Sequence, residues 1–195
     1  LLVKSLTDQS NVILAMAFDF ESSQRVGSLP LGSELDTQLN SEIGWIGFFA
    51  DLAGALVPSN YGHVNIEPGP DGIVRHLTER VSVGSQTIPS FPEQIVRLVQ
   101  SGSEPILGDN HHRVPYAFDP RTLATVSALE ILEGTAPIDL LKDRVLIIGS
   151  SAAGLADRVA TPLGFALPGV ALQAMTVEAW LQGDIWIDAF WINDW

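Results

Sequence analysis

Small residues beginning at Gly149 form the stretch that comes closest to a catalytic or phosphate-binding pattern. Gly149 and Gly154 have the spacing of the outer glycines of a P-loop, but Leu155 and Ala156 stand where that loop requires Lys and then Ser or Thr. Ser151 is not set in the G-x-S-x-G pattern of a hydrolase nucleophile, and no His lies near it in sequence. Small residues in such a turn more often allow close packing. The stretch therefore predicts neither a phosphate site nor a nucleophile.

A polar group follows this stretch and precedes the last expected helix. It comprises Asp157, Arg158 and Thr161. In open α/β sheets, ligands bind in the loops beyond the carboxyl ends of the strands. We therefore expect these three residues, together with Ser151, to contact a ligand. The other interpretation is that Asp157 and Arg158 pair with each other or cap a helix.

Three polar residues near an expected hairpin, His63, Asn65 and Arg75, form a second set of ligand-binding candidates. Because polar groups converge at strand ends, we expect a groove between the loop of residues 150–161 and the hairpin face near His63 and Asn65. The alternative is that these residues are cross-strand partners that only stabilise the hairpin.

The sequence gives little support to metal or cofactor chemistry. The chain has no Cys, which excludes disulfides, thiolate catalysis and Cys-based metal sites. His111 and His112 are adjacent, and neighbouring side chains on a strand point to opposite faces, so the pair lacks the geometry of a metal site. We expect no metal and no cofactor.

Two apolar runs, residues 11–18 (NVILAMAF) and 145–148 (VLII), predict buried central strands. Within residues 61–83, apolar and polar positions alternate on either side of the turn sequence PGPDG at 68–72, which predicts an antiparallel hairpin. Residues 112–118 predict a short strand. Pro115 cannot donate to a ladder, so this strand is expected at an edge or a bulge.

Three segments predict helices. The first two begin with the capping-box spacing of a Ser followed three residues later by a Glu, and they are expected to run from Ser90 to Gly102 and from Ser127 to Gly134. The third covers roughly residues 170–182, where apolar side chains recur on one face. The predicted fold class is α/β: a mixed sheet with buried central strands, one antiparallel hairpin and flanking helices.

Composition and charge fit one domain that does not bind nucleic acid. The 195 residues are 46% hydrophobic, with no apolar run near the roughly 20 residues of a membrane helix. The formal net charge of −13 repels phosphate backbones. Residues 184–195 hold three of the five Trp, which suits a membrane–water interface, although the tail could instead pack back on the domain. We expect a domain at 1–183 and a juxtamembrane Trp-rich connector at 184–195.

An ordered series of segments resembles the type-two CHASE domain, the cyclase/histidine-kinase-associated sensory extracellular domain. The matching segments are Gly62-His63-Val64-Asn65, Asp71-Gly72-Ile73-Val74-Arg75, Thr125-Val126-Ser127-Ala128, Lys142-Asp143-Arg144-Val145-Leu146-Ile147-Ile148-Gly149, Asp157-Arg158, Thr161-Pro162-Leu163 and Pro168-Gly169-Val170. An acidic strand segment and a Trp- and Pro-rich turn that the family shows at its start are absent. We therefore expect the domain to be N-terminally truncated.

The resemblance implies an input module on the extracytoplasmic (periplasmic) side of a bacterial cytoplasmic membrane. Transmembrane helices that this chain lacks would join it to a histidine kinase, nucleotide cyclase, diguanylate cyclase or Ser/Thr kinase. It implies a sensor and not an enzyme, with no catalytic residue, an unknown small-molecule signal and a homodimer in the receptor. The family has no general ligand, so the candidate site residues rest on loop position alone.

Two other functions stay open. A soluble α/β hydrolase or nucleotide-binding enzyme would need a phosphate loop or a nucleophile served by the distant His63 or His76. A structural ectodomain would hold two copies together without binding a small ligand. A ligand screen separates this last function from a sensor.

Overall fold

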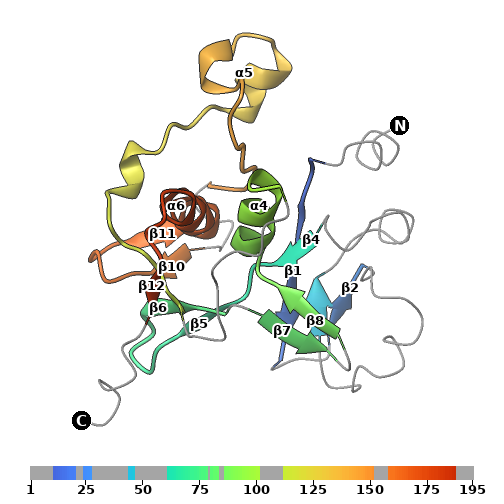
Figure 1. Cartoon of the computed structure of the whole chain (residues 1–195), viewed down its shortest axis with the longest axis vertical. Coiled ribbons are helices and arrows are strands. Elements are labelled where there is room, and N and C mark those ends of the chain that lie inside the picture. Colours follow the sequence, from blue (N-terminus) through green and yellow to red (C-terminus); the bar gives the residue numbers. More distant parts are fainter. Residues whose placement is uncertain are drawn as a thin grey trace.

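The fold is seen in a computed structural model, which describes residues 11–20, 24–27, 44–46, 61–78, 80–83, 86–101, 112–151 and 158–187. Within these residues the strands form several small sheets, and the helices α4 and α6 lie side by side against them (Figure 1). Strands and helices are mixed along the chain, as the predicted α/β class requires. No helix among these residues is long and apolar enough to cross a membrane.

One four-stranded sheet has the order β2-β3-β1-β4. Its strands are β1 (Leu14–Asp19), β2 (Arg25–Val26), β3 (Gly44–Ile46) and β4 (Tyr61–His63). β1 runs antiparallel to β3 and parallel to β4, so it is central, as predicted. Only Met16 and Phe18 of β1 are buried, while Ala15 and Asp19 are exposed. The strand therefore buries one face and not both.

The second four-stranded sheet contains the predicted hairpin. Its order is β12-β9-β6-β5, with β5 (Ile66–Pro68), β6 (Val74–Leu77), β9 (His112–Arg113) and β12 (Trp186–Ile187). The β5–β6 turn is closed by Gly69 N–H donating to Ile73 O over 3.0 Å, and Gly72 takes a φ of 75°, which glycine adopts without strain. β12 consists of Trp186 and Ile187, which belong to the connector predicted at residues 184–195.

Two further hairpins complete the strands. They pair β7 (Arg80–Val83) with β8 (Gln86–Pro89), and β10 (Arg158–Ala160) with β11 (Ala166–Pro168). β8 leads into α4, and β11 leads directly into α6. The two hairpins therefore set where the two main helices begin.

The helices begin close to where the sequence predicts them. They are α4 (Phe91–Val99), α5 (Ala128–Leu132) and α6 (Gly169–Leu181), with short 3₁₀ helices η2 (Pro120–Thr122) and η3 (Ile138–Leu140). The capping box of Ser127 and Glu130 is complete, and Gly134 follows α5 with a φ of 69°. In α4 only half of the box forms: Ser90 Oγ accepts from Glu93 N–H, but the Glu93 carboxylate binds two Arg side chains. The expected end at Gly102 lies outside the described residues.

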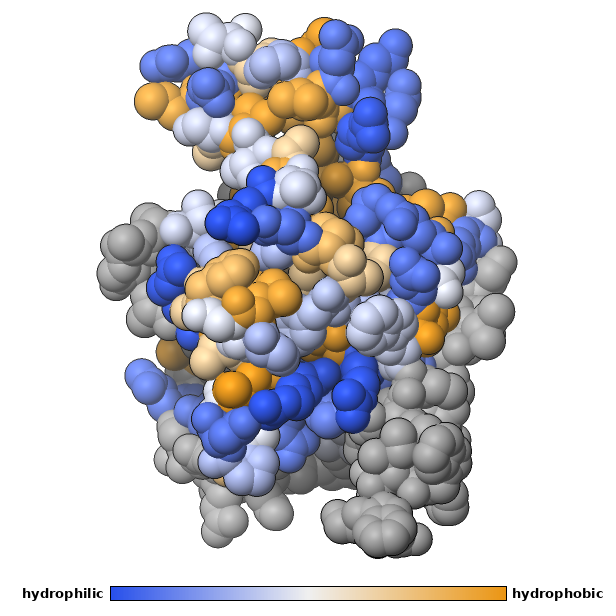
Figure 2. All heavy atoms as spheres, turned by 90° about the vertical axis from the view of Figure 1, so that its left-hand side faces the viewer, coloured by the Kyte–Doolittle hydropathy of each residue, from blue (hydrophilic) through white to orange (hydrophobic). Residues whose placement is uncertain are grey.

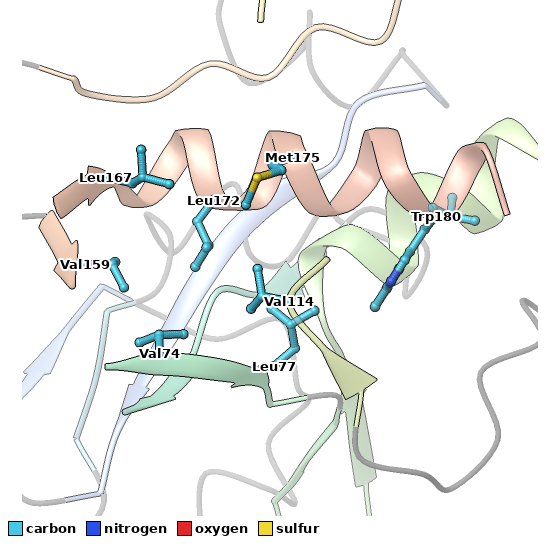
Figure 3. Packing of buried hydrophobic residues seen from close by; sticks show 9 residues of the cluster. Val74, Leu77, Val114, Val159, Leu167, Leu172, Met175 and Trp180 are labelled. Carbon is cyan, nitrogen blue, oxygen red and sulfur yellow. The ribbon is translucent and has the colours of Figure 1, made fainter. Parts of the chain in front are cut away.

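The main core is built around α6. Leu172, Met175 and Trp180 of this helix project onto Val74 and Leu77 of β6 (Figure 3). The full cluster also contains Val96, Val114, Val159 and Leu167. A helix that is apolar on most of its surface must be covered on several sides, and α6 is covered by α4, β11 and the second sheet.

The predicted strand at residues 145–148 is wrong. These residues form no strand, and Val145, Leu146 and Ile148 are exposed. The centre of the core, which a buried strand would occupy, is filled by α6. The segment lies outside that helix, and Gly149 approaches it so closely that an added Cβ would stand 2.6 Å from Val170 Cβ. An apolar run predicts that its side chains pack against another part of the protein, but it does not show which element they pack against.

The predicted edge position of residues 112–118 is also wrong. β9 lies between β6 and β12, and it ends at Arg113. Pro115 falls beyond the paired residues, so its missing N–H interrupts no ladder.

Candidate functional site

Asn65 joins two strands through its side chain. Its Oδ1 accepts from Phe18 N–H over 2.9 Å, and its Nδ2 donates to Phe18 O over 2.6 Å. Its own backbone N–H donates to Nδ1 of the fully buried His63 over 3.2 Å. One side-chain amide offers both a donor and an acceptor. Asn65 therefore bonds to the backbone of Phe18 in β1 as the backbone of a neighbouring strand would. This geometry supports the structural interpretation of His63 and Asn65.

Gly62 allows β4 to lie against the start of α4. A Cβ at this position would stand 2.7 Å from Phe91 Cα and 2.9 Å from Ser90 O, and both are backbone atoms. The neighbouring His63 forms an isolated parallel bridge with Ser90, the residue that caps α4. The surroundings of His63 are therefore tightly packed.

Arg75 is held in an exposed ion pair within the hairpin. Its Nη1 and Nη2 donate to Asp71 Oδ1 and Oδ2 over 2.9 Å and 2.7 Å. Asp71 Oδ1 also accepts from Ile73 N–H, and the hydrogen bonds from Arg75 and Ile73 lower the pKa of Asp71 to about 2. Arg75 thus stabilises the turn, and its guanidinium is at the surface.

Arg158, the first residue of β10, and Thr161, which directly follows β10, both fasten the β10–β11 hairpin with their side chains. Thr161 is buried, and its Oγ1 donates to Phe165 O over 2.7 Å. Arg158 is exposed, and its Nη2 donates to Ala166 O over 2.6 Å. Gly164 turns the chain with a φ of 81°. The structure therefore brings these two candidates together on one surface turn.

Arg121 is a second cation at this turn, which the sequence analysis did not identify. Its guanidinium carbon lies 5.5 Å from the centre of the Phe165 ring, within range of a cation–π contact. Its side chain also pairs with Asp119, the residue that caps η2. Arg121 lies 37 positions before Arg158, so no local pattern could have linked them.

The remaining candidates are less constrained. Ser151 is exposed and lies outside any helix or strand. Asp157 lies outside the described residues, so its predicted role stays a prediction. Apart from Ser151, the described candidates fall into two sets held by different elements: His63, Asn65 and Arg75 on β4 to β6, and Arg158 and Thr161 on the β10–β11 hairpin.

Glu93 is a buried carboxylate that the sequence analysis assigned only to a helix cap. It is 1% exposed, and its Oε1 accepts from Nη2 of Arg80 and of Arg97, each over 2.9 Å. The two cations neutralise a charge that would otherwise be costly to bury. The i,i+4 spacing of Glu93 and Arg97 was a usable signal. The cluster fastens the β7–β8 hairpin to α4.

A metal site finds no support in the part of the chain that the structure describes. Among those residues no group of three or more His, Cys, Asp or Glu side chains is arranged to hold a metal ion.

Comparison with known protein families gives one match. The family model described as "CHASE2 domain" matches residues 1–195, the whole chain. Searches among curated proteins and among solved structures found no match.

Proposed function

The chain belongs to the CHASE2 domain family, a family of sensory extracellular domains of receptors, and from this premise we propose that it is the ligand-sensing input domain of a bacterial transmembrane receptor. Its place is the periplasmic face of the cytoplasmic membrane. Its output is a histidine kinase, a nucleotide or diguanylate cyclase, or a Ser/Thr kinase. The family match along the whole chain is the observation that carries the proposal.

The ligand face that the geometry supports best is the β10–β11 turn. Arg158, in β10 beside this turn, is exposed, and within the described residues the one hydrogen bond of its side chain is from Nη2 to Ala166 O. A guanidinium has five N–H donors in a planar fork that fits carboxylate and phosphate groups, so most of its donors remain for a ligand. The chain has a net charge of −13, so an anion needs a local cation such as Arg158 in order to bind. A signal that carries a carboxylate or phosphate fits this turn, with Ser151 as a further contact. Asp157 would accept a hydrogen bond only from an N–H or O–H group of the same ligand.

The connection between this turn and the end of the chain supports a route for the signal. β11 ends at Pro168, the residue that caps α6, so a shift of the turn acts directly on the helix. After α6 the chain passes Gly183 and enters β12. A ligand moves such an element only by its differential affinity for two states, commonly about 1–3 kcal/mol.

A thermal-shift screen of small anions, sugars and amino acids tests the proposal on the whole chain. A ligand at 100 times its Kd adds about 2.7 kcal/mol to the free energy of unfolding, which is a readily measured rise in Tm. The rise is expected to be lost in Arg158→Ala and reduced in Thr161→Ala. Arg144→Ala is the matched control, because it removes the same charge from an exposed site on another segment.

Three outcomes would change the proposal. A ligand that still binds in Arg158→Ala and Asp157→Ala places the site elsewhere, and loss of binding in Arg75→Ala would place it on the hairpin. A screen without any ligand would favour a structural ectodomain.

The proposal includes the absence of catalysis by this chain. The purified chain is expected to turn over neither esterase nor phosphatase substrates. Turnover that disappears in Ser151→Ala would instead support the hydrolase function.

A further inference from the structure

Residues 123–151 form an arm whose returning end lies against α6. The arm leaves the rest of the domain after η2, forms α5 and η3, and returns to α6 at Gly149 (Figure 1). Its outer part is exposed: apolar side chains appear on the surface around α5 (Figure 2), and Leu132 is 84% exposed. The arm is therefore held to α6 mainly by the few residues of its returning end.

The returning segment, residues 147–149, crosses two turns of α6. Ile147 is half-buried and packs against a cluster formed by Val177 of α6 and residues of α4. At the other end of the segment, a Cβ added to Gly149 would stand 2.6 Å from Val170 Cβ. Val170 and Val177 are two helical turns apart. The backbone of the segment therefore lies over the part of α6 between these two valines.

Gln173 is the residue of α6 that lies beneath this segment. It follows Val170 by three positions and precedes Val177 by four, and side chains at these spacings are neighbours on one helix face. Gln173 is only 6% exposed, and its Oε1 is buried without a hydrogen-bond partner among the described residues. A buried acceptor of this kind is rare in native folds and costs free energy, so it requires a specific explanation.

The segment above Gln173 has the complementary unpaired groups. In the described chain, no backbone hydrogen bond is formed by residues 143–151. The N–H groups of residues 147–149 are therefore unpaired donors within that part of the chain. Elsewhere in this protein a side-chain amide already binds a backbone, because Asn65 bonds to both the N–H and the C=O of Phe18. One unpaired acceptor and three unpaired donors thus meet at the contact between the arm and α6.

We propose that Gln173 is a latch between the arm and α6: in a second state, its Oε1 accepts a hydrogen bond from a backbone N–H of residues 147–149. The structure shows the released state, in which both groups are unpaired. The free energy gained from the hydrogen bond and the conformational entropy lost in ordering the segment are of comparable size. The two states are therefore close in free energy, and a small bias decides between them.

The latch gives the ligand site a way to act on α6, and this step rests on the proposed function. Ser151, a candidate ligand contact, lies two residues after the segment. A ligand that holds Ser151 in place lowers the entropy lost in ordering the segment, and so favours the latched state. After α6 the chain passes Gly183 and enters β12. Latching is thus the step between ligand binding and the connector.

Amide hydrogen exchange of the whole chain without ligand tests the latch. In the wild type, at least one amide of residues 147–149 is expected to exchange about twofold or more slower than in an unstructured chain, twofold being the value for equal populations of the two states. Gln173→Met is expected to remove this protection, because Met has the length of Gln but is only a weak acceptor. Thr176→Val is the matched control and is expected to keep it. Thr176 is also buried in α6, but its Oγ1 donates to Leu172 O within the helix.

A second variant and an internal reference show whether the change is local. Gln173→Asn retains the amide but withdraws it by one methylene, so it is also expected to lose the protection. Protected amides of the β7–β8 hairpin in the same spectra show that each variant is folded. Amides of residues 147–149 that exchange as in an unstructured chain in the wild type, or equally slowly in both Gln173 variants, would overturn the proposal.

Basal output of the full-length receptor tests whether the latch contributes to signalling. Gln173→Met is expected to change the basal output, because it removes one of the two states, whereas Thr176→Val is not. Unchanged output in Gln173→Met would overturn the role in signalling. Neither measurement uses a ligand, so a failed latch leaves the ligand-sensing proposal standing. A ligand that does not bind at Arg158 equally leaves the exchange result standing.

Discussion

Asp71 and Arg75 form an ion pair whose contribution depends on the charge of Asp71. Hydrogen bonds from Arg75 and Ile73 lower the pKa of Asp71 from its ordinary 3.8 to about 2. A carboxyl with a lower pKa in the folded state stabilises the fold above its ordinary pKa, and this contribution is lost as the pH falls through the folded value. The window of loss therefore lies between about pH 4 and pH 2.

We predict that Asp71→Asn lowers the Tm slightly at neutral pH and not at all below the window. The effect is small because both partners are exposed to solvent. Asn retains an oxygen that can accept from Ile73 N–H, so the variant removes mainly the charge. Thermal melts from neutral pH down to about pH 2 measure the difference from wild type. A difference that does not change with pH would show that the ion pair contributes nothing.

The sequence could place single residues on elements but could not find their distant partners. Asn65 was correctly placed near the hairpin, yet its bonds to Phe18 span 47 positions. Arg121 was missed for the same reason. Side-chain partners of this kind depend on the tertiary fold, whereas the Asp71–Arg75 pair lies within four positions and is visible in the sequence.

The contact between β4 and α4 is an element-scale feature that depends on Gly62. We predict that Gly62→Ala destabilises the fold by about 1–3 kcal/mol, because backbone atoms of Ser90 and Phe91 must move to admit the methyl group. Gly134→Ala is the comparison: no atom lies within 4 Å of its added Cβ, and only its φ of 69° is unfavourable. Denaturant unfolding should therefore show the larger loss for Gly62→Ala. Equal losses would mean that the close approach is not maintained in solution.

The ion cluster of Glu93 connects the β7–β8 hairpin to α4. We predict that Glu93→Ala costs about 3 kcal/mol, the lower part of the range for breaking a buried pair, because both Arg partners are partly exposed and can rotate into water. Arg80→Ala should cost less, since Arg97 still neutralises the carboxylate. Urea unfolding of both variants measures the difference. A larger cost for Arg80→Ala would show that the hairpin contact dominates.

Local signals made the helix starts predictable, and their absence explains the misplaced strand. Ser90 and Ser127 each lie three positions before a Glu, so the spacing that marks a helix start is contained in the sequence. The apolar run at 145–148 does not show which helix or strand will lie beside it in the fold. Its place depends on α6 and on Gly149, which packs against Val170.

At the scale of the whole molecule, the segment after α6 connects the core to β12. We predict that one residue inserted after Gly183 in the full-length receptor abolishes the response to ligand, because it displaces Trp186 from its pairing with Arg113 and turns the chain beyond it. One residue inserted after Gly134 is the control, since that glycine lies in an open turn after α5. Output activity with and without ligand is the readout. A normal response of the variant with the insertion after Gly183 would exclude coupling through this segment.

The fold class was predictable at this scale. It was not predictable that residues 123–151 form an arm, which leaves the rest of the domain after η2, contains α5 and η3, and returns to α6 at Gly149 (Figure 1). The alternation of apolar runs and capped helices is a property of the sequence. Whether an apolar segment lies inside or outside the core depends on which element fills it, and here that element is α6.

The arm also divides the chain into two pieces that belong to one core. Lys142 and Arg144 are exposed, and the backbone from 143 onward to 151 forms no hydrogen bond within the described chain, so trypsin should cut there first. The core cluster draws Val74, Leu77, Val96 and Val114 from the first piece, and Val159, Leu167, Leu172, Met175 and Trp180 from the second.

After cleavage at Lys142 or Arg144, the two large fragments should stay together on a native column and separate only in denaturant. Coexpressed as separate chains, they should reassemble into the domain. Two fragments that part under native conditions would show that the peptide bond, and not the packing around α6, holds the halves together.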